Sequence, residues 1–283
     1  MAIASSGNGT TCTLTLTFQH DTNSGTPRTY TRTADVTLVA GYQNTITANI
    51  SGDTPLSVSV SALENWQIDH DAVDLGLPSG LLWATCNVGA DNPEDYGDYF
   101  AWGETTPHYS DGGSTSNPTW LDGYEAGYWW ETYKYCNGSQ TTLTKYCNDA
   151  NSGADSFTDT LTILTADDDA ASVIWGGEWR MPTAKEWDEL IENCTWTPTS
   201  NYNGTGIAGQ IVEGQKGNSI FLPAAGCRYY TYDVGIGSYA YYWSSSLYST
   251  TSATYLHFDI EDTVNPVRDL RVRGHSVRAV RKP

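Results

Sequence analysis

An abrupt change in residue pattern near residue 67 most constrains how this chain can fold. Before this point apolar residues alternate with threonine and serine, a period of two that is typical of β-strands. After it the sequence becomes rich in tryptophan, glycine and tyrosine. The change predicts two structural units, residues 1–66 and residues 67–283.

The first unit is expected to form a small antiparallel β-sheet. The alternation covers residues 12–18, 34–39, 45–50 and 56–60. Turn-forming residues separate these segments, at 23–27, 41 and 51–55. Three or four strands leave open edges or an uncovered face. We therefore expect this sheet either to pack on the second unit or to be part of a larger domain.

The second unit is expected to have an α+β fold that is mostly β-strand and irregular structure. The chain has 27 glycines, 11 tryptophans and 19 tyrosines but only 17% charged residues, which favours loops fixed by aromatic side chains over helical bundles. About two helices are indicated. One begins near Thr165, with aspartates at 167–169 near its positive end. The other begins at Thr183, which forms a capping box with Glu186, and presents Trp187, Leu190 and Ile191 on one face.

The acidic balance of the chain excludes some classes of partner. Fourteen basic against 33 acidic residues give a formal net charge of −19, which repels nucleic acids and anionic lipids. No segment approaches the roughly 18 apolar residues of a membrane span, and the first residues lack the features of a signal peptide. We expect no nucleic-acid partner and no direct membrane insertion, and an exported protein would have lost its leader.

The six cysteines are too sparse for a disulfide scaffold, and they contain no Cys-x-x-Cys pair that would suggest zinc. Cys136 and Cys147 each follow Lys-Tyr, and they bracket a short polar loop. They are a candidate disulfide. The alternative is a pair of buried free thiols.

The end of the first unit resembles a pilin family. The stretch Val39-Ala-Gly-Tyr-Gln-Asn-Thr-Ile-Thr47, followed by a strand and by Leu63-Glu-Asn-Trp66, is similar to the final strands of fimbrillin-type pilin domains. The resemblance implies that residues 1–66 form a partial fimbrillin-like domain, and that other pilin subunits are partners.

Seven ordered stretches of the second unit resemble a second family. They are Val73-Asp-Leu-Gly-Leu-Pro-Ser-Gly80, Trp83-Ala-Thr-Cys-Asn-Val-Gly89, Tyr99-Phe-Ala-Trp-Gly-Glu104, Trp175-Gly-Gly-Glu-Trp-Arg-Met-Pro-Thr-Ala-Lys-Glu-Trp187, Phe221-Leu-Pro-Ala-Ala-Gly226, Tyr241-Tyr-Trp-Ser-Ser-Ser246 and Ser276-Val-Arg278. Together they resemble the Fibrobacter succinogenes major paralogous domain, a large group of surface proteins. The resemblance covers residues 73–281 and implies a C-type-lectin-like domain at residues 67–283, outside the cell, on its surface or on a pilus.

Members of this fold also serve as variable proteins of diversity-generating retroelements, in which adenines of asparagine codons are rewritten. Such rewriting never produces Lys, Gln, Glu, Met or Trp. These five types make up 35 of the 283 residues, so a window of 26 would hold about three, whereas residues 248–273 hold only Glu261. A diversified ligand-binding segment at about 228–275 explains this bias, and so does a strand pattern that prefers Thr, Val, Tyr and Asp.

The candidate ligand-binding residues lie in this segment. Eight tyrosines between 229 and 255, Tyr230 and Tyr232 among them, are interleaved with Gly, Ser and Thr, as in antibody paratopes. The alternative is that these rings fill a β-core, above all Tyr239, Tyr241 and Tyr242. By position, the retroelement resemblance implies that the following residues line the ligand surface: Tyr248, Thr250, Ser252, Thr254, His257, Asp259, Asp262, Asn265, Arg268, Asp269 and Arg273.

Strand alternation assigns faces within this segment. Leu256, Phe258 and Ile260 should lie on one face, with His257 and Asp259 on the other, exposed to solvent. By the same rule Asp269, Arg271 and Arg273 should lie opposite Leu270 and Val272. Five of the nine arginines lie between 268 and 281. They either recognise carboxylate or sulfate groups or pair with the abundant aspartates.

We expect no cofactor, no metal and no enzyme activity. Residues 92–94 and 167–169 are the candidate calcium ligands, and neither has the paired motifs of calcium-dependent lectins. Residues 179–187 also resemble formylglycine-generating enzymes, whose copper site needs paired cysteines near the C-terminus. Here the last cysteines are Cys194 and Cys227. The five histidines are scattered, and catalytic motifs are missing.

Together these features predict a surface-displayed adhesin or receptor-like protein that binds an extracellular glycan or protein ligand. The two resemblances together further imply a pilus-tip protein that is diversified by a retroelement. One alternative is a formylglycine-generating-enzyme-like oxidase or a relic of one. The other is a structural pilus subunit.

Overall fold

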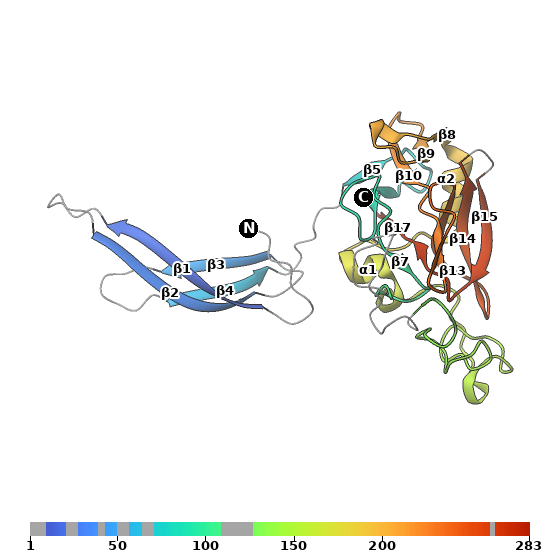
Figure 1. The fold of residues 1–283 in the computed structure, drawn as a ribbon, viewed down its shortest axis with the longest axis horizontal. Helices are drawn as coiled ribbons and strands as arrows, with labels where there is room; N and C mark the ends of the chain where they lie inside the picture. Colours follow the sequence, from blue (N-terminus) through green and yellow to red (C-terminus); the bar gives the residue numbers. More distant parts are fainter. Residues whose placement is uncertain are drawn as a thin grey trace. The chain divides into compact units, whose positions relative to one another are not determined.

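The computed structural model describes residues 10–20, 28–38, 43–49, 57–63, 71–108, 127–260 and 264–283. The chain divides into two compact units, Met1–Asp69 and His70–Pro283, and this division falls close to residue 67 (Figure 1). Strands dominate the described residues, which contain only two α-helices. The predicted α+β fold that is mostly β is therefore confirmed.

The first unit contains two antiparallel strand pairs. The strands are β1 (Thr10–His20), β2 (Arg28–Leu38), β3 (Gln43–Asn49) and β4 (Ser57–Leu63). β1 pairs with β2, and β3 pairs with β4. The strands overlap the four segments in which apolar residues alternate with threonine and serine, a pattern that suits a pleated backbone.

The second unit combines thirteen short strands with the two helices. The strands are β5 (Ala72–Asp74), β6 (Leu82–Asn87), β7 (Tyr99–Phe100), β8 (Thr195–Thr199), β9 (Gly209–Glu213), β10 (Ser219–Pro223), β11 (Cys227–Tyr229), β12 (Tyr232–Val234), β13 (Tyr239–Ser249), β14 (Ser252–Asp259), β15 (Asn265–Leu270), β16 (His275–Ser276) and β17 (Arg278–Arg281). The helices are α1 (Ala170–Trp175) and α2 (Ala184–Asn193), with 3₁₀ turns at Ala154–Ser156, Ala166–Asp168 and Tyr202–Gly204.

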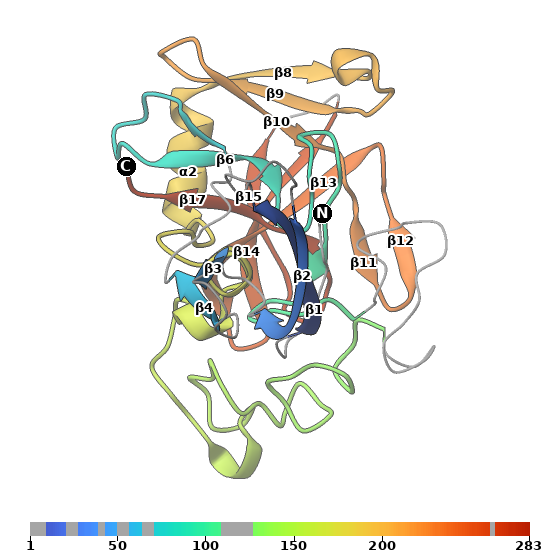
Figure 2. The same cartoon turned by 90° about the vertical axis from the view of Figure 1, so that its left-hand side faces the viewer.

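A five-stranded sheet forms the centre of this unit, in the order β15-β14-β13-β16-β7. β13, β14 and β15 form a continuous antiparallel meander, which Figure 2 shows beside α2. The β11–β12 hairpin lies next to β13, because Gly226 donates a hydrogen bond from its amide to the Tyr239 carbonyl at 2.8 Å. Two three-stranded sheets, β10-β9-β8 and β17-β6-β5, complete the unit.

Aromatic side chains fill the core on both faces of the central sheet. On one face, Trp187 and Leu190 of α2 pack with Tyr242, Leu256 and Phe258. On the other face, a second cluster is built around tryptophans that include Trp102, Trp179 and Trp243. The buried indole N–H groups of Trp102 and Trp243 donate to the Ser244 and Phe100 carbonyls, each at 2.8 Å. These bonds fix the rings as well as burying them.

The helix starts show one correct and one wrong prediction. Thr183 and Glu186 form the predicted capping box at the start of α2. Thr165, however, makes no side-chain cap and precedes only a 3₁₀ turn. Asp169 caps α1 instead, since its carboxylate accepts a hydrogen bond from the Ser172 amide at 3.0 Å. Asp169, the third aspartate of residues 167–169, is therefore the helix cap that Thr165 was expected to be.

The candidate disulfide between Cys136 and Cys147 is not formed, and both are free cysteines. Across the polar loop the backbone partner of Cys136 is Leu143, four residues before Cys147. The two thiols donate to different carbonyls, Cys136 to Trp130 at 2.9 Å and Cys147 to Asp149 at 3.2 Å. The alternative of two free thiols is correct, although only Cys147 is fully buried.

Candidate ligand-binding site

Solvent-exposed tyrosines are concentrated in one part of the second unit. Among the side chains that the structure describes, Tyr230, Tyr232, Tyr239 and Tyr248 are exposed, to 37%, 63%, 39% and 55%. All four lie within residues 228–275, and the other described tyrosines are buried or half-buried. Because a soluble protein rarely leaves large side chains exposed together without a role, this concentration indicates a contact surface.

Two of these rings, Tyr230 and Tyr239, belong to one surface, which we call the tyrosine face. It consists of Tyr229, Tyr230, Tyr239, Tyr241, His257 and Arg273. On the central sheet Tyr241 lies opposite His257, and the His257 ring contacts the Tyr239 and Tyr241 rings at 5.9 and 5.0 Å. On the adjacent hairpin the Arg273 guanidinium covers the Tyr229 ring at 4.4 Å, and Tyr229 contacts Tyr230 at 4.3 Å.

The β11–β12 hairpin holds Tyr230 in a strained conformation. Tyr229 and Tyr232 pair, so Tyr230 and Thr231 form a two-residue turn, and Tyr230 has φ of +52°. Such turns favour Asn, Asp or Gly, and a tyrosine there costs roughly 1–3 kcal/mol. Backbone hydrogen bonds between Tyr230 and Tyr128 hold the turn in place. Strain of this kind is concentrated at functional sites, which supports a role for the exposed Tyr230 ring.

The half-buried carboxylate of Asp269 contacts the tyrosine face at Arg273. Asp269 forms an ion pair with Arg273 at 3.0 Å and contacts Nε2 of His275 at 3.3 Å. His275 is fully buried and stacks on Trp243 at 3.9 Å. Burial lowers the pKa of His275 despite the nearby carboxylate. Burial alone would raise the pKa of Asp269, but His275 and Arg273 outweigh it and the pKa is lowered.

A hollow of about 490 Å³ lies along β14 and β15 of the meander. It is lined by Tyr248, Thr254, Tyr255, Pro266, Val267 and Arg268, and we call it the Arg268 hollow. Thr254 pairs with Arg268, whereas His257 pairs with Asn265. Because positions 254 and 257 differ by an odd number of residues, the pleat directs their side chains to opposite faces. Thr254 therefore shares a face with Leu256, which packs near α2.

The structure distributes the sequence-predicted ligand residues over both faces. His257, Asp259, Asn265, Asp269 and Arg273 lie on the side of the tyrosine face, with Tyr230 and Tyr232 on the adjacent hairpin. Tyr248, Thr254 and Arg268 lie at the Arg268 hollow. Thr250 and Ser252 lie at the β13–β14 turn, where Thr250 donates a hydrogen bond to Asn148 at 3.1 Å. Asp262 lies outside the described residues.

The predicted alternation is confirmed in β14 but fails after β15. Leu256 and Phe258 are buried, and His257 and Asp259 are partly exposed. Arg271, expected to share a face with Asp269 and Arg273, is instead fully buried, because the strand ends at Leu270. Its guanidinium donates to the carbonyls of Lys145, Tyr146 and Thr250 at 2.8–3.1 Å and to the Tyr133 hydroxyl at 3.0 Å.

Part of the tyrosine face was expected, as one alternative, to fill the core. The alternative that Tyr239, Tyr241 and Tyr242 fill a β-core is correct for Tyr242. Tyr239, however, is exposed, and Tyr241 is only half-buried. Their odd positions in the strand, opposite Asp259 and His257, would have indicated this side of the sheet. Trp129 contacts Tyr230 at 5.2 Å from a distant part of the chain, and no local pattern could have indicated it.

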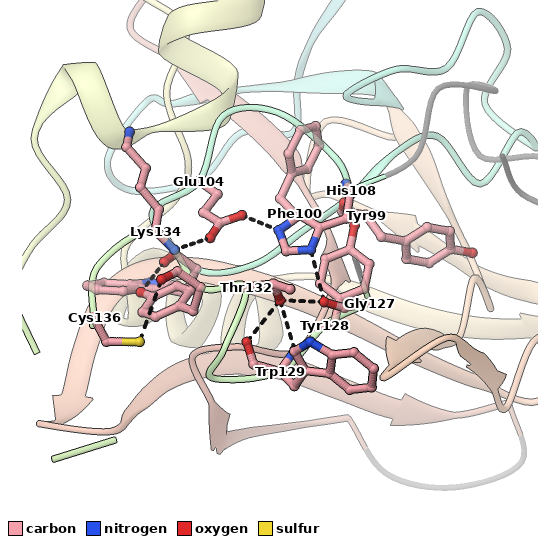
Figure 3. Close-up of polar contacts among 12 residues, drawn as sticks. Tyr99, Phe100, Glu104, His108, Gly127, Tyr128, Trp129, Thr132, Lys134 and Cys136 are labelled. Atoms are coloured by element: carbon pink, nitrogen blue, oxygen red, sulfur yellow. Dashed lines mark hydrogen bonds and ion pairs between the residues drawn. The ribbon is translucent and has the colours of Figure 1, made fainter. Parts of the chain in front are cut away.

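A second polar cluster lies around His108 (Figure 3). Its Nε2 lies 2.6 Å from a Glu104 carboxylate oxygen, and its Nδ1 lies 3.1 Å from the Gly127 carbonyl. The ring stacks on Tyr128 at 4.4 Å, and the other Glu104 oxygen accepts a hydrogen bond from the Lys134 amide at 2.8 Å. The cluster links residues 104–108 to residues 127–134, and we therefore assign it a structural role.

The acidic and cysteine candidates for metal chemistry are engaged elsewhere. Asp168 accepts hydrogen bonds from the Tyr135 and Tyr146 hydroxyls at 2.5 and 2.6 Å. Burial raises the pKa of Cys194 to about 11 and that of Cys227 to about 12, so both are protonated thiols at neutral pH. Within the described residues no group of three or more His, Cys, Asp or Glu side chains is placed to hold a metal ion.

No known protein-family model matches the chain, and no curated protein or solved structure is significantly similar to it. No helix in the described part is long and apolar enough to cross a membrane.

Proposed function

We propose that this protein is a surface-displayed adhesin or receptor-like protein that binds an extracellular glycan or protein through the tyrosine face. The single observation that carries the proposal is the concentration of exposed tyrosines within residues 228–275. Tyrosine offers a broad, rigid contact area with a polar tip and loses little conformational entropy on binding. The mixture of rings with His257, Asn265 and Arg273 suits recognition by hydrogen bonds and stacking.

The core beside this face supports the proposal, because exposed Tyr239 is not part of it, although half-buried Tyr241 packs against it. Trp243 and Tyr255 pack into the core from the same strands that carry Tyr241 and His257. Substitutions at the exposed positions therefore leave the packed layer intact. A C-type-lectin-like domain whose final segment is diversified by a retroelement would use such a surface, and this is the lineage that we propose.

Binding is tested by screening the labelled full chain on an array of glycans and on an array of extracellular protein domains. Tyr239→Ala and Tyr230→Ala should each weaken binding to the selected ligand by about tenfold or more. Phe157→Ala is the matched control, since Phe157 is exposed to 37%, as Tyr230 is, and is outside the tyrosine face. Equal losses in all three variants, or none in the tyrosine variants, would contradict the proposal.

Diversification is tested separately in the genome that encodes the chain. A near-copy of the coding segment for residues 240–281, with adenines at the variable positions, should lie beside a reverse transcriptase gene. Absence of such a copy would remove diversification from the proposal and leave the binding role untouched.

A further inference from the structure

Two half-buried arginines of the second unit have carboxylate partners, and Arg268 differs from them. Arg180 pairs with Glu186 at 2.6 Å, and Arg273 pairs with Asp269 at 3.0 Å. Arg268 is exposed, and among the described residues no carboxylate lies within ion-pair distance of it. Its guanidinium covers the Tyr248 ring at 4.7 Å and donates one hydrogen bond to the Tyr248 hydroxyl. In a chain of net charge −19, Arg268 is thus an exposed guanidinium whose neighbour in the described part of the chain is an aromatic ring.

Arg268 also lines the Arg268 hollow. The hollow of about 490 Å³ lies in the size range of small-ligand sites and has room for one or two sugar rings. Its lining offers a flat aromatic ring from Tyr248, a hydroxyl from Thr254 and apolar surface from Pro266 and Val267. One planar cation beside such surfaces suits a ligand with a single anionic group and a partly apolar ring.

We propose that the Arg268 hollow binds an acidic sugar, with a carboxylate or sulfate group on the Arg268 guanidinium. The planar fork of arginine binds either group through two parallel hydrogen bonds. The sugar ring packs on Tyr248, and the Thr254 hydroxyl contacts a sugar hydroxyl. This inference goes beyond the proposed function, because it assigns a second site that is separate from the tyrosine face. An extended polyanion does not fit, because the acidic chain would repel its remaining charges.

Three probes that differ only at carbon 6 test the inference: galactose, galacturonate and galactose 6-sulfate. Each is titrated into the full chain, and binding is followed by NMR. Galacturonate or galactose 6-sulfate should bind at least about tenfold more tightly than galactose, as a charge-assisted contact predicts. The stronger of the two acidic probes identifies carboxylate or sulfate as the group that is recognised.

Variants show where the probes bind. Arg268→Gln should remove the preference for the acidic probes and leave the weak binding of galactose unchanged. Tyr248→Ala should weaken all three probes together. Lys282→Gln is the control, because it removes one exposed positive charge at the end of the chain and should change nothing.

Two results would overturn the inference. One is an Arg268→Gln variant that binds the acidic probes as the parent does. The other is tight binding of an aspartate-rich peptide at the hollow with no binding of either acidic sugar, which would assign the site to a protein ligand. If Tyr239→Ala abolishes binding on the arrays while Arg268→Gln has no effect in either assay, the proposed function stands and only the hollow fails.

Discussion

Three arginines close together in the sequence have three different roles, and the difference lies in their surroundings. Arg268 is exposed, Arg273 forms an ion pair, and Arg271 is fully buried. Aromatic rings surround Arg271, with Trp102 and Tyr133 each 5.2 Å from its guanidinium carbon. Its charge is balanced by carbonyl oxygens and ring faces, which satisfy the donors of the fork. Composition alone cannot distinguish these roles.

Replacing Arg271 should therefore destabilise the second unit. Arg271→Met leaves the carbonyls of Lys145, Tyr146 and Thr250 without this donor, and a buried group without a partner costs about 1–3 kcal/mol. We expect a loss of about 3 kcal/mol or more, measured by urea unfolding monitored through tryptophan fluorescence. Arg268→Gln serves as the comparison and should unfold as the parent does. Equal stability of Arg271→Met and the parent would show that the buried fork is dispensable.

His275 should make stability depend on pH in mildly acidic solution. Its pKa is lowered from 6.5 by burial, so folding favours the neutral ring. The stability that this provides is complete above pH 6.5 and is lost as the pH falls towards the folded-state pKa, by at most about 1.4 kcal/mol per pH unit. The pKa of Asp269 is lowered from its usual 3.8. This carboxylate therefore makes stability depend on pH only near and below about pH 3.8, outside this window.

His275→Gln should flatten this decline between pH 6.5 and 5, measured as the midpoint of thermal unfolding at each pH. His257→Gln is a suitable control, since His257 is only partly buried and contacts the same Tyr241 ring. If the midpoint of thermal unfolding of the parent protein is constant between pH 6.5 and 5, the buried histidine does not make stability depend on pH.

At the scale of elements, the sequence predicted those features whose signals are local. The capping box of α2 and the alternation of β14 each depend on residues within one turn or one strand. The start of α1 was misassigned because Thr165 and Asp169 are both good cap residues, and only tertiary packing selects Asp169. The Met181 amide also donates to its carboxylate, at 2.8 Å, from beyond the helix.

The division of the site between two faces could have been predicted, but the partners of each face could not. Odd and even positions in β14 already separate His257 from Thr254. The bulges between Trp243 and Ser249 are what bring Tyr248 beside Arg268, and no residue pattern marks them. Trp129 and the β11–β12 hairpin join the tyrosine face through contacts between distant segments.

The turn of the β11–β12 hairpin offers a test that separates stability from binding. Tyr230→Asn replaces a strained tyrosine by a residue that tolerates positive φ, and the relief of roughly 1 kcal/mol offsets the lost contact with Trp129. We expect an unfolding temperature no lower than that of the parent, with binding to the array-selected ligand at least about tenfold weaker. A lower unfolding temperature with intact binding would mean that the ring serves the fold.

At the scale of the whole molecule, the second unit contains the interactions that close it. β17, at its C-terminal end, pairs with β6, which pairs in turn with β5 at its N-terminal end. Arg278 ties the two ends together, because its guanidinium donates to Asn87 Oδ1 at 2.8 and 2.9 Å. The sequence indicated two units from the change in texture, but this pairing of the two ends depends on tertiary structure.

A fragment of residues 71–283 should therefore fold without the first unit. Its core clusters are built from residues 72–280, and all of these residues are in the fragment. We expect the same thermal midpoint for the tryptophan signal as in the full chain, and the same binding of acidic sugars. Removing residues 278–283 from this fragment is the contrasting change, since it deletes β17 and the Arg278 hydrogen bonds and should prevent cooperative unfolding. If the thermal midpoint of fragment 71–283 is well below that of the full chain, the first unit stabilises the second. If a fragment that ends at residue 277 unfolds as cooperatively as fragment 71–283, the pairing of the two ends is not what closes the unit.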